Sequence, residues 1–188
     1  MSSDGLAGTL DRLSYTQLFM QLDDEAQGKI WSTPKAENDL RSIVLDTRKS
    51  ERTRFLAAEL LAARSKRLAK AVPGDVLAQV YVGGLRSGAS QMANPWGLPG
   101  STGPLSERVL ALGKAATASL LEALDDAEPM VYSGSREATV GNSYGWRVKD
   151  QAASLLAALR GERLVPDSDP RKRDQAIAAL RERVRKNG

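Results

Sequence analysis

Apolar side chains recur along most of this chain at spacings of three and four residues, the period of an amphipathic α-helix. Between residues 50 and 70, for example, Phe55, Ala58, Leu61 and Ala62 fall on one helical face. The apolar positions are mostly Ala, Leu and Val, and aromatic residues make up only 5% of the chain, which favours closely packed helices over a β-sandwich. We therefore expect an all-α protein of about seven or eight helices.

Cap and turn residues delimit these helices. Ser14, Thr33 and Ser50 stand where N-caps are expected, the Val72-Pro73 step breaks the chain, and Gly161 is placed to end a helix. The predicted helices cover approximately residues 14–24, 34–46, 51–70, 74–88, 105–112, 114–125 and 143–159, and a last one opens at Asp169-Pro170.

Part of this pattern occurs twice. Five positions recur with an offset of 80 residues: Ala36, Leu40, Ile43, Val44 and Asp46 correspond to Ala116, Leu120, Ala123, Leu124 and Asp126. An Arg-led segment with Ala-Ala-x-Leu-Leu follows each copy, at Arg52 and again at Arg147, so the later copy contains an insertion of 15 residues. A repeated pair of helices predicts a short, irregular α-solenoid, in which each unit buries its apolar face against a neighbour.

The run Ala111-Leu112-Gly113-Lys114-Ala115-Ala116, continued by Leu120, Leu121, Leu124 and Asp125, resembles the HEAT family of helical repeats. The resemblance covers residues 35–64 and 105–160 and implies stacked helix pairs within one domain spanning residues 1–188. Repeat proteins of this kind commonly bind other macromolecules, and insertions between their helices often form the binding face.

Two long loops interrupt the predicted helices, at residues 88–104 and 127–146. Aromatic residues beside Arg, Ser and Asn are typical of recognition surfaces. The candidate contacts for a protein partner are Met92, Trp96, Tyr132, Arg136, Glu137, Asn142, Tyr144 and Trp146. The alternative for the second loop is that Met130, Val131 and Tyr132 attach it to the core, while Arg136 and Glu137 satisfy local main-chain groups. The alternative for Trp96 is that it fills a gap in the core.

Trp146 and Asp150 are four residues apart, which would place them on one face of a helix. This pair is similar to the aromatic residue and carboxylate of alkylpurine DNA glycosylases, which are also built from HEAT-like repeats. The resemblance implies a carboxylate that stabilises positive charge as a base leaves. An ion pair of Asp150 with Arg147 or Lys149 explains the same residues.

The net charge of +4 comes from the C-terminal segment, because residues 169–188 contain seven of the 27 basic residues but only three of the 23 acidic ones. Arg181, Arg183, Arg185 and Lys186 could contact phosphate groups, which makes nucleic-acid binding an alternative function. A solvated helix face with cations near its C-terminus explains the same positions.

The chain contains neither cysteine nor histidine, which excludes thiolate nucleophiles, disulfides, Cys/His zinc sites and histidine-based triads. No phosphate loop or calcium loop is recognisable. We expect no metal and no cofactor. No apolar run approaches the roughly 18–20 residues of a membrane span, and the N-terminus lacks the features of a signal peptide. We expect a cytoplasmic protein, with an exported mature form as the alternative.

Together these features predict a non-catalytic scaffold, adaptor or accessory subunit that presents residues 88–104 and 127–146 to another protein. The alternatives are a nucleic-acid-binding protein that uses the basic C-terminal helix and a HEAT-like enzyme of the DNA glycosylase type.

Overall fold

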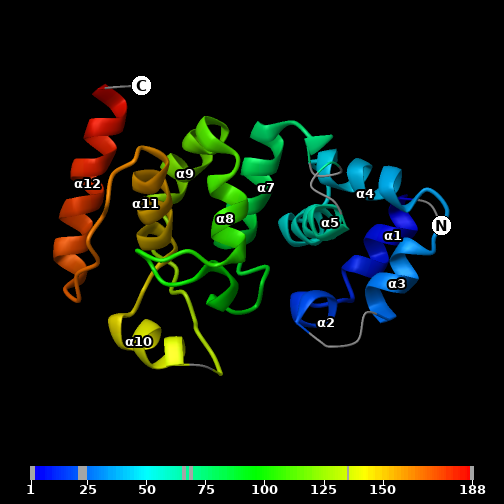
Figure 1. The fold of residues 1–188 in the computed structure, drawn as a ribbon, viewed down its shortest axis with the longest axis horizontal. Coiled ribbons are helices and arrows are strands. Elements are labelled where there is room, and N and C mark those ends of the chain that lie inside the picture. Colours follow the sequence, from blue (N-terminus) through cyan, green and yellow to red (C-terminus); the bar gives the residue numbers. More distant parts are fainter. Residues whose placement is uncertain (1–2, 21–24, 65–66, 68–69, 135, 187–188) are drawn as a thin grey trace. The chain divides into compact units, whose positions relative to one another are not determined.

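The computed structural model describes residues 3–20, 25–64, 67, 70–134 and 136–186 (Figure 1). These residues form eleven α-helices and two 3₁₀ helices, and the only β-structure among them is an isolated bridge between Pro129 and Arg147. The protein is all-α, as the sequence predicts, although it has more helices than the seven or eight expected. By its internal contacts the chain divides into two compact units, Met1–Gln91 and Met92–Gly188.

In its described residues, the first unit contains six α-helices. They are α1 (Ser3–Leu10), α2 (Tyr15–Phe19), α3 (Glu25–Trp31), α4 (Ala36–Leu45), α5 (Glu51–Arg64) and α7 (Gly74–Arg86). Helix α5 packs against α1, α4 and α7, and it is buried around most of its circumference. The Phe55 ring lies at the centre of this core, 5.9 Å from the ring of Tyr81 in an edge-on arrangement.

Cap residues in the sequence predict some of these helix boundaries correctly but not others. Ser14 forms a capping box with Gln17 at the start of α2, as expected from its place in the sequence. Helix α2 ends at Phe19, and the remainder of the expected helix, residues 21–24, lies outside the described residues. Helices α1 and α3 were not expected. Helix α4 begins at Ala36, later than the predicted cap Thr33.

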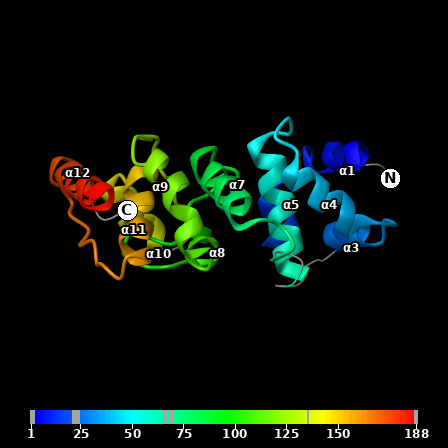
Figure 2. The same cartoon turned by 90° about the horizontal axis from the view of Figure 1, so that it is seen from above.

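The second unit is built around α11. Its elements are η1 (Asn94–Trp96), α8 (Pro104–Leu110), η2 (Gly113–Ala116), α9 (Thr117–Ala123), α10 (Arg136–Tyr144), α11 (Val148–Leu159) and α12 (Pro170–Lys186). Helix α11 packs against α8, α9 and α12, and in the view of Figure 2 α9 and α12 lie on its two sides. Three apolar residues of α12 enter the core, namely Ile177, Leu180 and Val184.

The two expected loops have more structure than predicted. Residues 88–104 contain η1, and the segment 127–146 contains α10, so the latter is a loop, a short helix and a second short connection. Gly97 and Gly103 allow two stretches of the first loop to touch, because a Cβ on Gly97 would lie 2.7 Å from the Gly103 nitrogen. Gly97 also has a φ of 76°, a conformation that favours glycine.

Each unit contains one copy of the repeated sequence pattern. In the first unit α4 packs on α5, and in the second unit α9 packs on α11. The corresponding residues Leu40 and Leu120 are both fully buried. The repeat therefore corresponds, within each unit, to a packed pair of helices.

Candidate functional site

The two segments predicted to form the contact surface are joined to one another in the second unit. The Ala93 N–H donates to the Val131 carbonyl at 2.8 Å, and the Ser133 N–H donates to Asn94 Oδ1 at 3.0 Å. The Tyr132 hydroxyl donates to the Gly97 carbonyl at 3.0 Å. Residues 92–98 and 131–133 are thus held in one arrangement by main-chain and side-chain hydrogen bonds.

Helix α10 is fixed to this arrangement through Tyr132. The Asn142 carboxamide makes two hydrogen bonds to the main chain of Tyr132. Its Oδ1 accepts from the N–H at 3.1 Å, and its Nδ2 donates to the carbonyl at 2.9 Å. Gly141 lies against the Tyr132 ring so closely that a Cβ there would be 2.4 Å from a ring carbon. Helix α10 therefore needs a glycine and an asparagine at successive positions to pack on this ring.

Three of the aromatic residues expected as contacts belong to the core. The exposed fraction is 1% for Trp96 and 2% for both Tyr132 and Trp146. Burial raises the pKa of the Tyr132 phenol well above its ordinary value, and the charge of Asp150 adds to this effect. The expectation that these rings meet a partner is corrected accordingly: their size makes them useful for closing the core around two irregular segments.

The other predicted contact residues are Met92, Asn142, Tyr144, Arg136 and Glu137. Met92 is half-buried, and its sulfur accepts a hydrogen bond from the Ser133 hydroxyl at 3.8 Å. Asn142 and Tyr144 are exposed on α10. Arg136 and Glu137 form the start of α10, but their side chains lie outside the part of the chain that the structure describes.

Apolar side chains that the sequence analysis did not select are exposed on the same segment. Val131 and Val140 are exposed, and Val140 shares a face of α10 with Tyr144, one helical turn away. Among the described residues only six large apolar side chains are exposed, and three of them belong to residues 131–144. Exposed apolar area therefore concentrates on this segment.

Trp146 connects α10 to α12. Its ring stacks on Tyr144 with a centroid separation of 5.0 Å, and the Arg173 guanidinium lies over it at 4.6 Å. Such a cation over an indole face is attracted by the electron density of the ring. The structure differs from the expectation that Trp146 and Asp150 share a helical face, because α11 begins at Val148 and Trp146 precedes it.

Asp150 is the centre of a buried ion-pair network. Its Oδ2 accepts from the main-chain N–H of Arg147 at 2.9 Å and from Nε of the same residue at 3.0 Å. Its Oδ1 accepts from Arg147 Nη2 at 2.9 Å and from Arg173 Nε at 3.2 Å. Since its side chain is 2% exposed, the carboxylate is compensated by protein donors alone. Both carboxylate oxygens are therefore engaged by donors of Arg147 and Arg173.

Further charges extend the network toward solvent. Asp174 binds Arg147 Nη2 at 2.9 Å and Lys149 Nζ at 2.8 Å. Burial opposes the ionisation of Asp174, but the hydrogen bonds from Lys149 and Arg147 outweigh it, and the pKa of Asp174 is lowered. The hydrogen bond to Asp150 is the main reason why the pKa of Arg147 is raised. Both shifts favour the ionised forms of Asp174 and Arg147.

Sequence analysis did not select Arg173, which proves to be a central residue of this region. Its guanidinium also donates to the carbonyls of Asp167 at 2.9 Å and Gly145 at 3.2 Å. A signal for this role exists in the sequence, because Arg173 lies in register with Ile177, Leu180 and Val184 on the apolar face of α12. A cation on an apolar helix face needs a buried anion.

The candidate basic patch consists of residues that mostly pair with acids. Arg181 binds Asp125 at 2.7 Å, Arg183 binds Glu162 at 2.9 Å, and Arg185 lies 3.5 Å from Glu182. Hydrogen bonds from Arg160 and Arg183 lower the pKa of Glu162. These pairs reduce the positive potential that a nucleic acid would meet on α12.

Comparison of the chain with protein-family models, curated proteins and solved structures gives no match. In the described part of the chain, no helix is both long enough and apolar enough to cross a membrane. No group of three or more Asp or Glu side chains is arranged to hold a metal ion in that same part.

Proposed function

We propose that this protein is a short α-solenoid of HEAT-like helix pairs that binds another protein without catalysing a reaction. The observation that supports this function best is the exposure of Val131, Val140 and Tyr144 on a segment that hydrogen bonds hold in place. Apolar side chains on a pre-organised surface can bind a partner at low ordering cost. The packing of α4 on α5 and of α9 on α11 supports the HEAT-like assignment.

The proposed contact surface consists of Val131, Val140 and Tyr144. Interfaces concentrate their binding energy in a few well-packed residues, among which Tyr, Trp and Arg are enriched, so Tyr144 is the expected centre of this surface. Val140 and Tyr144 lie one turn apart on α10, so a partner helix or strand can contact both at once. Three buried rings, those of Trp96, Tyr132 and Trp146, hold the main chain of this surface in place.

The test is affinity capture from the native cells with three baits: the wild type, the double variant Val140→Ser/Tyr144→Ser and the control Leu45→Ser. Leu45 is exposed to a similar extent but belongs to the first unit. We expect one protein that the wild type and Leu45→Ser capture equally and that the double variant loses by at least tenfold. Equal capture by all three baits refutes the proposed surface.

The same experiment addresses the nucleic-acid alternative. Captured material that disappears after nuclease treatment, and that depends on Arg181 and Arg183 rather than on Val140 and Tyr144, would establish binding through α12. Binding of that kind would also weaken steeply with salt.

A further inference from the structure

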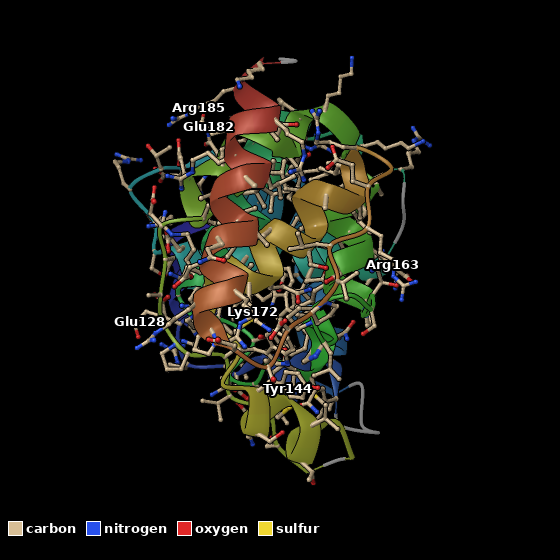
Figure 3. The ribbon with its side chains drawn as sticks, turned by 90° about the vertical axis from the view of Figure 1, so that its left-hand side faces the viewer. Glu128, Tyr144, Arg163, Lys172, Glu182 and Arg185 are labelled. Carbon is tan, nitrogen blue, oxygen red and sulfur yellow. The ribbon has the colours of Figure 1, made fainter. Side chains whose placement is uncertain are left out.

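The segment between α11 and α12 runs extended along the surface of the second unit. Residues 162–167 form neither helix, strand, turn nor bend. Figure 3 looks onto α12 and shows this segment running beside the helix, with Arg163 on the side away from it. From Glu162 to Val165 half-buried and exposed side chains alternate, and Val165 is 75% exposed. One face of this extended chain is therefore open to solvent.

The main chain in the middle of this segment has no hydrogen-bond partner in the described part of the protein. Neither the N–H nor the carbonyl of Arg163, Leu164 or Val165 takes part in a hydrogen bond there. An endopeptidase holds its substrate as an extended strand, through hydrogen bonds to main-chain groups of this kind. The three residues can therefore pair with such an enzyme without first breaking hydrogen bonds of their own.

Ion pairs at the surface hold the two ends of the segment. Glu162 pairs with Arg160 and with Arg183, each at 2.9 Å, and all three side chains are at least a quarter exposed. At the other end Asp167 lies 3.7 Å from Lys172. Ion pairs in contact with solvent contribute little to stability. They therefore offer little resistance to a local rearrangement of the segment.

The segment also packs loosely on the unit beneath it. A cavity of about 140 Å³ is lined by Leu164, Val165 and Pro166 together with residues of α11 and α12. The hydrogen bond from Arg173 Nη1 to the Asp167 carbonyl, at 2.9 Å, lies beyond these residues, next to the start of α12. Segments with few packed contacts open locally at low free-energy cost. The chain around Arg163 can therefore adapt to an enzyme while α12 stays in place.

Arg163 differs in its surroundings from the other basic residues. It is exposed, and it forms no ion pair with any residue that the structure describes. Every other described Lys or Arg lies in a helix, a turn or a bend, or at the isolated bridge. An endopeptidase with an acidic specificity pocket selects a basic side chain before the bond that it cleaves. Backbone and side chain together meet the requirements of such an enzyme at the bond between Arg163 and Leu164.

We propose that the peptide bond between Arg163 and Leu164 is a site of limited proteolysis by an endopeptidase that cleaves after arginine. Water adds across this bond, so that Arg163 acquires a carboxylate, Leu164 acquires an amino group, and no oxidant or reductant is needed. The chain is thereby divided after α11, and α12 becomes part of a separate peptide of residues 164–188. This inference goes beyond the proposed function and does not depend on it.

Cleavage leaves α12 bound, because its contacts with the rest of the unit do not involve the cleaved bond. Ile177, Leu180 and Val184 remain buried, and Arg173 still pairs with the buried Asp150 at 3.2 Å. The product is a two-chain form in which α12 is retained by non-covalent contacts alone.

The test is limited digestion of the full chain with trypsin, followed by mass spectrometry of the products at early times. We expect peptides that begin at Leu164 to form at least tenfold faster than peptides that end at Arg12 or Arg48, which are exposed in turns. Cuts elsewhere in the chain do not obscure this comparison, because each end is identified by mass. Cleavage at Arg12 or Arg48 that equals or precedes cleavage at Arg163 overturns the proposal.

Three variants connect the cut to this residue. Arg163→Gln is expected to remove it, Arg163→Lys to retain it, and the control Arg48→Gln to leave its rate unchanged. Both positions are exposed, so the variants are expected to fold, and far-ultraviolet circular dichroism verifies this. Loss of the cut in Arg163→Lys, or lasting inhibition of trypsin by the uncut chain, would show that the segment is not a substrate.

Size-exclusion chromatography of the briefly digested protein tests the retention of α12. We expect the peptide 164–188 to elute together with the larger fragment in buffer and to separate from it in urea. Separation in buffer would show that α12 depends on the intact chain for its binding, and it would overturn the proposed two-chain form.

Discussion

Asn142 pairs with the main chain of Tyr132 much as a neighbouring β-strand would, with its carboxamide accepting from the N–H at 3.1 Å and donating to the carbonyl at 2.9 Å. One side chain thereby satisfies two backbone groups in a segment that has no regular structure. The position of α10 relative to the loop preceding it depends on this pair of bonds.

Asn142→Ala is expected to lower the free energy of unfolding by about 1–2 kcal/mol, since each hydrogen bond contributes about 1 kcal/mol net. Amide hydrogen exchange is expected to accelerate at Tyr132 and Ser133. Ser143→Ala is the matched control, because the Ser143 hydroxyl only donates to Val140 within α10. Unchanged exchange at Tyr132 in Asn142→Ala would contradict the assigned role.

Asp150→Asn is expected to destabilise the protein by about 3–5 kcal/mol, the range found when a buried ion pair loses one partner. The substitution keeps the shape of the side chain but leaves Arg147 and Arg173 without their shared anion. Urea-induced unfolding measures the change in the free energy of unfolding. In the control Asp125→Asn, which removes the exposed pair with Arg181, the expected loss is below about 1 kcal/mol. Similar losses for both variants would refute the central role of Asp150.

Tyr132 is expected to make the protein sensitive to alkali. Its pKa is raised by burial, whereas an unfolded tyrosine titrates near pH 10, so only the unfolded state loses this proton just above that pH. Stability from the protonated phenol is fully present below about pH 10 and declines above it by at most about 1.4 kcal/mol per pH unit. The stability difference between the wild type and Tyr132→Phe is therefore expected to shrink between about pH 9 and 11. A difference that stays constant over this interval would show that Tyr132 titrates normally.

Two glycines in the first unit are expected to respond oppositely to alanine. A Cβ at Gly84 in α7 would lie 2.4 Å from a ring carbon of the buried Phe55, so Gly84→Ala forces the core to shift and is expected to cost about 1–3 kcal/mol. A Cβ at Gly28 in α3 meets nothing within 4 Å, and Gly28→Ala is expected to stabilise by about 0.5–1 kcal/mol. Thermal unfolding measures the change in stability of both variants. Destabilisation by Gly28→Ala would mean that α3 is not helical there.

The sequence predicted an all-α fold correctly because helices are indicated by the spacing of apolar residues and by cap residues, and both signals lie within each helix or at its ends. Ser14 and Gln17 form the capping box that their spacing indicates, and Pro170 opens α12 as predicted. Helices α1 and α3 escaped prediction because they are short, contain Gly5, Gly8 and Gly28, and gain their stability from packing against other helices.

The candidate site was predictable as a pair of segments but not as a set of contacts. The joining of residues 92–98 to residues 131–133 depends on hydrogen bonds over more than thirty positions, such as the bond from Ser133 to Asn94. The amino-acid composition of a segment does not show which of its aromatic side chains is buried. Trp146 and Tyr144 are two residues apart in sequence, yet Trp146 is buried and Tyr144 is exposed, because α10 ends at Tyr144.

The buried network also constrains how this sequence can change over generations. Replacing Asp150, Arg147 or Arg173 singly leaves an uncompensated charge in the core, whereas replacing them together by apolar residues of similar volume removes that charge at little cost. Among descendants of this chain, these three positions are therefore expected to be inherited or lost as a set. The exposed pairs of α12 carry no such constraint and can drift independently.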